Sequence, residues 1–356
     1  MRILYGVQGT GNGHLSRARA MAAAFAAYDD VHVDYLFSGR DADGFFDMQC
    51  FGDYRLKDGL TLITSKGRVS HWKTLFRNHY PRFLRDVYTL DVASYDLLLT
   101  DFEPITAWAG RLRRKPVISL GHQPAFDFDV PVAARDWRSA WILRHFAPGS
   151  TRIGMHWHDF GCPILPPMIH RPQTLPGSER RGANKVLVYL PFESPSDVQK
   201  VFSQVAGYEF FIYSPGSPTH SYGNLHLRSP SLTGFHRDLS DCQAVICSAG
   251  FELVSECLSL GKRLLVKPVV CQMEQESNAL ALQNLGYAEV LGALDAGEIQ
   301  DWLHRHTRAT AIDYPDVAGA LADWIHQGDY GRSALSKLST ALWSQTQLQP
   351  LPHLAA

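Results

Sequence analysis

The chain has 356 residues, enough for two domains of ordinary size, and 45% of its residues are hydrophobic, as in a globular protein. Its net charge of −1 argues against a dedicated nucleic-acid-binding protein, which usually carries a basic surplus. The apolar run near the N-terminus, residues 21–28, is far shorter than the ~20 residues that span a bilayer, and the start lacks a signal-peptide core, so we expect a cytoplasmic protein.

Short apolar runs alternate with helical stretches through the first half of the chain. Residues 3–7 and 31–37 read as strands, and an alanine-rich helical stretch, residues 14–27, lies between them. Two further compact apolar runs follow at residues 95–100 and 116–120. Strands that alternate with helices predict βαβ units and a parallel sheet.

A glycine loop, Gln-Gly-Thr-Gly-Asn-Gly-His at residues 8–14, connects the first strand to the first helix. Gly11 and Gly13 allow the backbone to approach a ligand, and the helix start behind them offers free N–H groups. The dinucleotide fingerprint needs a third glycine where this chain has His14, which argues against NAD.

Three residues are candidates for a general base. His14 lies at the positive end of the predicted helix, which disfavours the imidazolium form, and a neutral ring can accept a proton. Glu103 follows the strand at 95–100, at the carboxyl edge where open α/β sheets bind ligands, and His122 follows the strand at 116–120. His14 is equally compatible with a capping or packing role.

A second βα series begins after a proline-rich stretch at residues 162–183. Four apolar runs then read as strands, at residues 186–190, 209–213, 244–247 and 263–267. Two such series predict two doubly wound domains that face a shared cleft. The expected units are an N-terminal domain at 1–165, a linker at 166–183, a C-terminal domain at 184–329 and a segment at 330–356 whose helix packs back on the N-terminal domain.

A second anion site is predicted where the strand at 244–247 leads into a helix that starts near Gly250 and ends at Gly261. Ser248, Ala249 and Gly250 are small and leave room for a diphosphate above the helix start. Glu256, between one and two turns further on, can accept two hydrogen bonds from a ribose diol. An ordinary surface glutamate would fit the same pattern.

These two blocks carry a family resemblance. The Gly-x-Gly-Asn-Gly-His loop resembles that of the lipid-II-forming N-acetylglucosaminyltransferases (MurG) and their relatives, and residues 248–279 are similar to the donor-binding segment of UDP-glycosyltransferases. Gly-His-Leu-Ser-Arg at 13–17 and Asp-Phe-Glu-Pro at 101–104 resemble a less characterised, MurG-like branch. The resemblance implies the GT-B architecture, which is two Rossmann-like domains facing a cleft, and a nucleotide-sugar donor, commonly a UDP-sugar.

The resemblance also implies roles for individual residues in the C-terminal domain. Glu256 would hold the ribose hydroxyls, and Glu274 and Gln275 would contact the sugar. The remaining donor contacts would come from the base-binding and diphosphate-binding segments: Phe235, His236, Ser248, Ala249, Gly250 and Phe251. No cofactor or metal is expected, because the helix N-terminus stabilises the leaving group.

The leading hypothesis is therefore an inverting, metal-independent glycosyltransferase of the hexosyl or N-acetylhexosaminyl type, with a lipid-linked or glycan acceptor of the cell envelope. A UDP-N-acetylhexosamine 2-epimerase and a non-catalytic nucleotide-sugar-binding protein remain open. Residues 66–85 hold six Lys or Arg, no acid and several aromatic residues, so the segment suits either peripheral contact with the inner face of a membrane or packing in the core.

Overall fold

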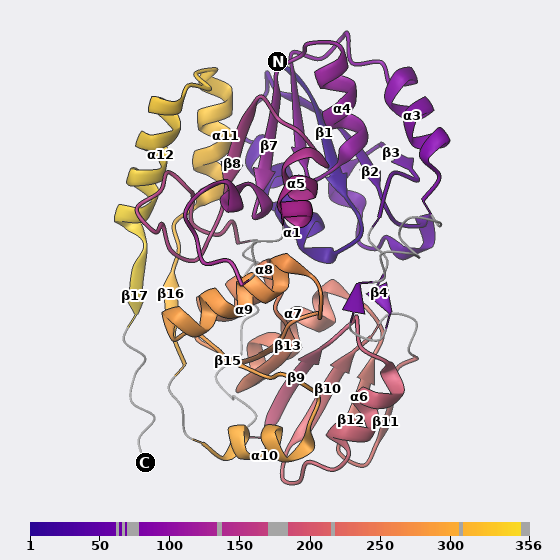
Figure 1. Cartoon of the computed structure of the whole chain (residues 1–356), viewed down its shortest axis with the longest axis vertical. Helices are drawn as coiled ribbons and strands as arrows, with labels where there is room; N and C mark the ends of the chain where they lie inside the picture. Colours follow the sequence, from indigo (N-terminus) through magenta and orange to yellow (C-terminus); the bar gives the residue numbers. More distant parts are fainter. Residues whose placement is uncertain are drawn as a thin grey trace.

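The computed structural model describes residues 1–61, 64–65, 68–69, 78–133, 137–169, 184–214, 218–305 and 309–349, without the side chains of 64–65, 68–69 and 137–140. The chain forms two α/β halves, each built around its own sheet, that lie one above the other in Figure 1. Most of the expected linker, residues 170–183, and half of the basic segment at 66–85, residues 66–67 and 70–77, lie outside the described residues.

The N-terminal sheet has the strand order β3-β2-β1-β6-β7-β8, and all of its neighbouring strands are parallel. Its strands are β1 (Arg2–Gln8), β2 (His32–Ser38), β3 (Tyr54–Lys57), β6 (Leu97–Asp101), β7 (Val117–Gly121) and β8 (Thr151–Gly154). The order reverses beside β1, so the carboxyl ends of β1 and β6 flank the switch point where such sheets bind ligands. Helices cover both faces, which is why every residue of β6 and β7 is buried.

Two groups of helices cover this sheet. Alternate residues of β1 divide between them, since Ile3 and Tyr5 belong to the core under α1 whereas Leu4 belongs to the core under α3 and α4. The helical segments of this half are α1 (Asn12–Phe25), α3 (Tyr80–Thr89), α4 (Pro104–Leu112), α5 (Trp137–His145) and the short 3-10 turns η1 (Ala42–Gly44), η2 (Gln49–Phe51) and η3 (Gln123–Asp127). The short strands β4 (Thr64–Ser65) and β5 (Arg68–Val69) pair antiparallel.

The C-terminal sheet has the order β11-β12-β10-β9-β13-β14-β15 and is parallel except where β11 pairs with β12. Its strands are β9 (Lys185–Tyr189), β10 (Glu209–Tyr213), β11 (His220–Tyr222), β12 (Leu225–Arg228), β13 (Ala244–Ser248), β14 (Arg263–Lys267) and β15 (Glu289–Val290). Its helices are α6 (Pro195–Phe202), α7 (Leu232–Asp241), α8 (Phe251–Ser259), α9 (Met273–Leu285) and α10 (Ala296–His304).

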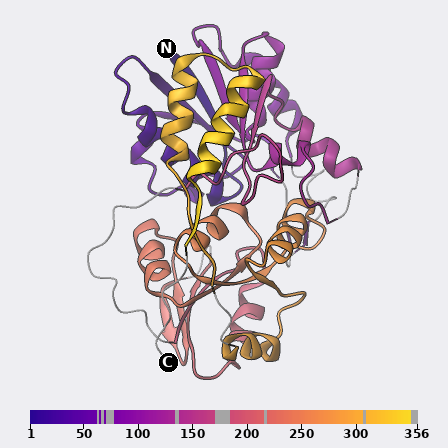
Figure 2. The same cartoon turned by 90° about the vertical axis from the view of Figure 1, so that its left-hand side faces the viewer.

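The C-terminal segment returns to the N-terminal half. Helices α11 (Val317–Gln327) and α12 (Arg332–Gln345) stand beside the N-terminal sheet in both views (Figures 1 and 2), and β16 (Ala311–Asp313) pairs with β17 (Gln347–Gln349) below them. The Tyr28 hydroxyl after α1 donates to Asp323 of α11, and Trp343 of α12 donates to the Ile164 carbonyl at 2.7 Å.

This path differs from the boundary expected at residue 329, because α11 already lies on the N-terminal half. The apolar face of α11, which includes Leu321 and Ile325, is buried in the core cluster that contains α1. The local sequence pattern of α11 does not indicate whether the helix packs on α1 or on the C-terminal sheet, which is nearer in the chain. No helix in the described part of the chain is long and apolar enough to span a bilayer.

Candidate functional site

A cavity of about 290 Å³ lies between the two halves and has walls from both. Its size suits a small-molecule ligand. Twelve of the residues predicted from sequence line it: Gly11, Gly13, His14, His122, Phe235, His236, Ser248, Gly250, Phe251, Glu256, Glu274 and Gln275. Glu103 and Ala249 are not among the lining residues.

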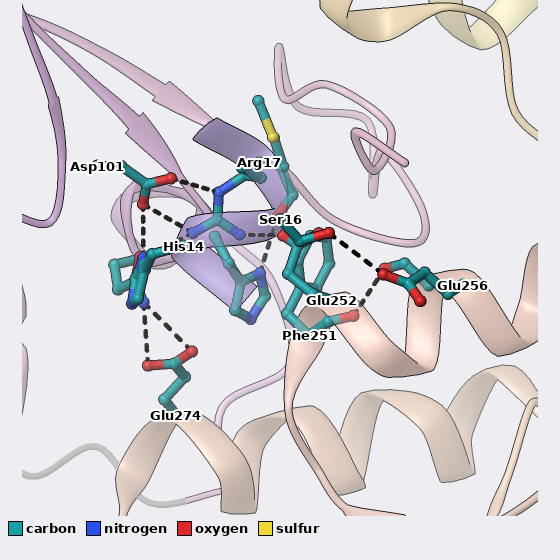
Figure 3. Close-up of polar contacts among 12 residues, drawn as sticks. His14, Ser16, Arg17, Asp101, Phe251, Glu252, Glu256 and Glu274 are labelled. Atoms are coloured by element: carbon teal, nitrogen blue, oxygen red, sulfur yellow. Dashed lines mark hydrogen bonds and ion pairs between the residues drawn. The ribbon is translucent and has the colours of Figure 1, made fainter. Parts of the chain in front are cut away.

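His14 is held by a carboxylate from the neighbouring strand (Figure 3). The parallel register pairs Val7 of β1 with Asp101 at the end of β6, which brings Asp101 beneath the first turn of α1. His14 Nδ1 lies 2.6 Å from Asp101 Oδ1, and the ring is 14% exposed. Arg17 Nη2 also lies 2.9 Å from this Nδ1, but it donates to Asp101 Oδ1 at 2.7 Å. Because the carboxylate only accepts, we assign the ring proton to Nδ1, which leaves the lone pair on Nε2.

Arg17, one turn along α1, joins this pair to the opposite half. Its Nε and Nη2 donate to the two oxygens of Asp101 at 2.7 Å each, and its Nη1 pairs with Glu252 of α8. Burial opposes ionisation of Asp101, but Arg17 and His14 hold its pKa below the ordinary value. Burial raises the pKa of Glu252 to about 7, with Arg17 opposing that rise.

The start of α8 faces the cavity without a side-chain cap. Gly250 is the N-cap residue, with φ −78° and ψ 141°, and an added Cβ there would meet no atom within 4 Å. The first N–H groups of the helix are therefore free to bind an anion. The helix begins where the sequence predicted and ends at Ser259, two residues before the expected Gly261. Ala249 is buried, and its carbonyl accepts from Asn278 Nδ2 at 2.9 Å.

Glu256 lies further along α8 and also borders the cavity. Its Oε1 lies 3.3 Å from the Ser16 hydroxyl of the N-terminal half, and its Oε2 lies 3.7 Å from His236 Nε2 of α7. Burial, and then the neighbouring Glu252, raise its pKa to about 8. Phe235 precedes His236 on α7. The residues that the resemblance assigns to the nucleobase, Phe235 and His236, therefore lie along the same wall as Glu256, which it assigns to the ribose.

The first turn of α9 supplies Glu274 and Gln275. Both carboxylate oxygens of Glu274 lie 3.3 Å from Gln123 Nε2 of the N-terminal half. Gln275 Oε1 accepts from the Val269 backbone N–H at 3.0 Å, so this oxygen holds the preceding loop. Glu274 is therefore the α9 carboxylate that faces across the cavity.

The other two candidate bases have structural roles. Glu103 is the N-cap residue of α4, and its fully buried carboxylate accepts from the backbone N–H groups of Ile105 and Thr106 and from the Ser38 hydroxyl at 2.7–2.8 Å. The prediction that Glu103 serves as a base is wrong, because the proline at 104 starts a helix that takes up this side chain.

His122 borders the cavity but has no free ring nitrogen. Its Nδ1 donates to the Met155 carbonyl at 2.8 Å, its Nε2 lies 2.6 Å from Asn278 Oδ1, and its ring stacks on Phe251. Burial also lowers its pKa. His122 therefore packs the interface between the halves and does not fit the role of a base.

Gly13 lines the cavity and also has a packing role. A Cβ at Gly13 would lie 2.8 Å from Glu252 Cγ, so the missing side chain lets α1 approach α8. Sequence reasoning missed Asp101, Arg17 and Glu252. Asp101 was visible as the polar residue that directly follows a buried strand, but the other two give no local signal.

Comparisons with known proteins identify the family and fold. A family model described as Glycosyl transferase family 1 matches residues 1–306. The glycosyltransferase SnogD from Streptomyces nogalater is 17% identical, with 97% of this chain and 99% of that chain covered and a TM-score of 0.51. The spinosyn rhamnosyltransferase SpnG, in complex with thymidine diphosphate, is 15% identical, with 97% and 96% covered and a TM-score of 0.54.

The calicheamicin glycosyltransferase CalG4 is also similar, at 14% identity, with 97% of this chain and 94% of that chain covered and a TM-score of 0.52. At such identities the likeness bears on the fold, and it confirms the expected GT-B architecture. No curated protein matches the sequence.

Proposed function

The chain belongs to glycosyl transferase family 1, so it is a glycosyltransferase, and we propose that it moves a sugar from a nucleotide-sugar to an acceptor hydroxyl with inversion at the anomeric carbon. The observation that carries this proposal is the His14–Asp101 hydrogen bond of 2.6 Å at a cavity that also receives the uncapped start of α8. A base and an anion site thus meet at one cavity, as a displacement reaction requires.

His14 is the proposed base. Its Nε2 takes the proton of the acceptor hydroxyl while the acceptor oxygen bonds to the anomeric carbon. The bond from that carbon to the donor diphosphate breaks, and the diphosphate leaves with the electron pair. Asp101, held ionised by Arg17, stabilises the imidazolium that forms. A single displacement from the opposite face inverts the anomeric centre.

The donor fits the C-terminal wall. The free N–H groups at the start of α8 would stabilise the leaving diphosphate, the role that a metal has in other transferases, which supports a metal-independent reaction. Glu256 would accept hydrogen bonds from the ribose hydroxyls, Phe235 and His236 would contact the nucleobase, and Glu274 would contact the sugar. The MurG-like resemblance favours a UDP-sugar, whereas SpnG was crystallised with thymidine diphosphate.

A nucleotide panel tests the donor assignment. UDP, UDP-glucose, UDP-N-acetylglucosamine and TDP-glucose are each added in excess, and the ligand that binds the folded state should raise the melting temperature. Release of the nucleoside diphosphate identifies a transferase, whereas an epimerase interconverts sugars and keeps the diphosphate attached, and a binding protein does neither.

His14→Ala tests the base assignment. We expect turnover to fall by a factor of ~10²–10⁴, the usual contribution of a general base, while calorimetric affinity for UDP stays as in the unmodified protein. His32→Ala, an exposed histidine at the start of β2, is the matched control. Full activity in the His14 variant would remove His14 as the base. Location in the cytoplasm, a cell-envelope acceptor and contact with a membrane remain predictions.

A further inference from the structure

Four charged or titratable side chains form a buried cluster across the two halves, and we call His14, Arg17, Asp101 and Glu252 the interdomain cluster. Arg17 is 2% exposed and Asp101 is fully buried, and Arg17 bonds to both oxygens of Asp101 and to Glu252 (Figure 3). Three members come from the N-terminal half, and Glu252 is the only one from the C-terminal half.

The cluster leaves Arg17 little freedom. A planar guanidinium that donates to two carboxylates has its plane and its distance from each fixed at once. Asp101 Oδ1 accepts from Arg17 Nη2 at 2.7 Å and from His14 Nδ1 at 2.6 Å. The orientation of the His14 ring is therefore tied to the position of Arg17, both through Asp101 and through Arg17 Nη2, which lies 2.9 Å from His14 Nδ1.

Glu252 occupies a special place on α8. It is the second residue of the helix whose start forms the anion site, and its Cγ lies where a side chain at Gly13 would be. A carboxylate so close to a bound diphosphate would repel it, and the contact with Arg17 offsets that charge. The Arg17–Glu252 pair therefore lies between the proposed donor site at the start of α8 and the proposed base, His14.

On the basis of the proposed function, we propose that Glu252 is a positioning residue, which acts through Arg17 and Asp101 to hold His14 in the orientation for proton transfer. The base is then fully held only when α8 of the donor-binding half lies against α1. Closure of the two halves around the donor would complete the catalytic arrangement.

A double-mutant cycle separates this role from a merely structural one. Glu252→Gln, Asp101→Asn and the combined variant are assayed for UDP release from UDP-N-acetylglucosamine with water as acceptor. Glu252→Gln should lower kcat ~10- to 100-fold, the loss expected for a misplaced catalytic group, and should not weaken UDP binding, because it removes a carboxylate beside the diphosphate. In the Asp101→Asn background the same change should add much less, because Asp101 accepts from both Arg17 and His14, and without its charge Arg17 keeps only its 2.9 Å contact with His14 Nδ1.

Tyr28→Phe is the matched control, since it removes a hydrogen bond of the α1 segment to α11, away from the cavity, and should leave kcat unchanged. A second readout needs no turnover. In protein labelled with ¹⁵N-histidine, the His14 Nδ1–H resonance should lie far downfield because it donates to Asp101. Glu252→Gln should shift or broaden this resonance, and Tyr28→Phe should not.

Two results would overturn the proposal: a Glu252→Gln variant with normal kcat and an unmoved His14 resonance, or losses that multiply fully in the combined variant. These differ from failure of the proposed function. If His14→Ala and Asp101→Asn both retain normal turnover, the base assignment itself is wrong. If both lose turnover and Glu252→Gln does not, only the role of Glu252 is wrong.

Discussion

Replacing Asp101 with asparagine removes the charge at the centre of the cluster and keeps its shape. Asp101 accepts three hydrogen bonds, from His14 Nδ1 at 2.6 Å and from Arg17 Nε and Nη2 at 2.7 Å each. An asparagine has one acceptor oxygen and one NH₂ group. If the NH₂ group faces Arg17 Nε, two donors oppose each other. If it faces His14 Nδ1, the histidine proton moves to Nε2, the atom that must accept a proton.

The size of the effect follows from burial. Removing one partner of a buried ion pair costs about 3–5 kcal/mol of stability, because it leaves an uncompensated charge. Arg17 keeps Glu252, so we expect the lower part of that range. Turnover should fall by a factor of ~10²–10⁴, since the base loses its orientation and tautomer, while nucleotide affinity should remain, because Asp101 does not line the cavity.

The assay combines urea unfolding, UDP release from UDP-N-acetylglucosamine and calorimetric titration with UDP. Asp86→Asn is the matched control, because Asp86 is also buried and bonds to Lys57 at 2.8 Å on the opposite face of the N-terminal sheet. It should lose stability and keep its activity per folded molecule. A folded Asp101→Asn protein with normal turnover would refute the dyad.

Further predictions concern the C-terminal wall and the contact between α1 and α8. Glu256→Ala should weaken UDP binding ~10- to 100-fold, since it removes the partner of two ribose hydroxyls and each hydrogen bond contributes about 0.5–1.5 kcal/mol. Unchanged calorimetric affinity would contradict the ribose assignment. The free energy of unfolding should fall as pH rises from about 5 to about 8. In the folded protein the pKa of Glu252 is raised to about 7 and that of Glu256 to about 8, above the ordinary 4.5. The unfolded chain therefore loses these protons at lower pH than the folded protein, which favours unfolding as the pH rises. Urea unfolding from acid to alkaline pH checks this, and Glu256→Gln should flatten the dependence. Gly13→Ala should cost about 1–3 kcal/mol because its Cβ would lie 2.8 Å from Glu252 Cγ, whereas Gly11→Ala, whose Cβ meets nothing within 4 Å, should show no such packing cost in the same unfolding assay.

Local patterns were sufficient for the architecture and for one half of the site. The apolar runs at residues 3–7, 95–100 and 116–120 became strands of one parallel sheet, because a strand buried on both faces is apolar along its length. The small residues before α8 identified the helix start, because glycine and a following periodic run indicate a helix N-terminus from a few adjacent positions.

Which acid contacts His14 was decided only by tertiary structure. Asp101 and Glu103 are two positions apart and equally acidic. The parallel register of β1 and β6 places Asp101 under His14, whereas Glu103 caps its own helix. Sequence reasoning made Glu103 an alternative base and gave Asp101 no role, since it could see the strand end but not the strand order.

The contacts that complete the site join residues far apart in the chain. Arg17 is 84 positions from Asp101 and 235 from Glu252, and all three meet within one buried cluster. Periodicity, turns and caps report the backbone over a few neighbouring residues, which is why the sequence determined the two halves and their helix starts. Strand order and the packing of α1 on α8 are set by the burial of whole surfaces, so only the folded chain decided which charges meet.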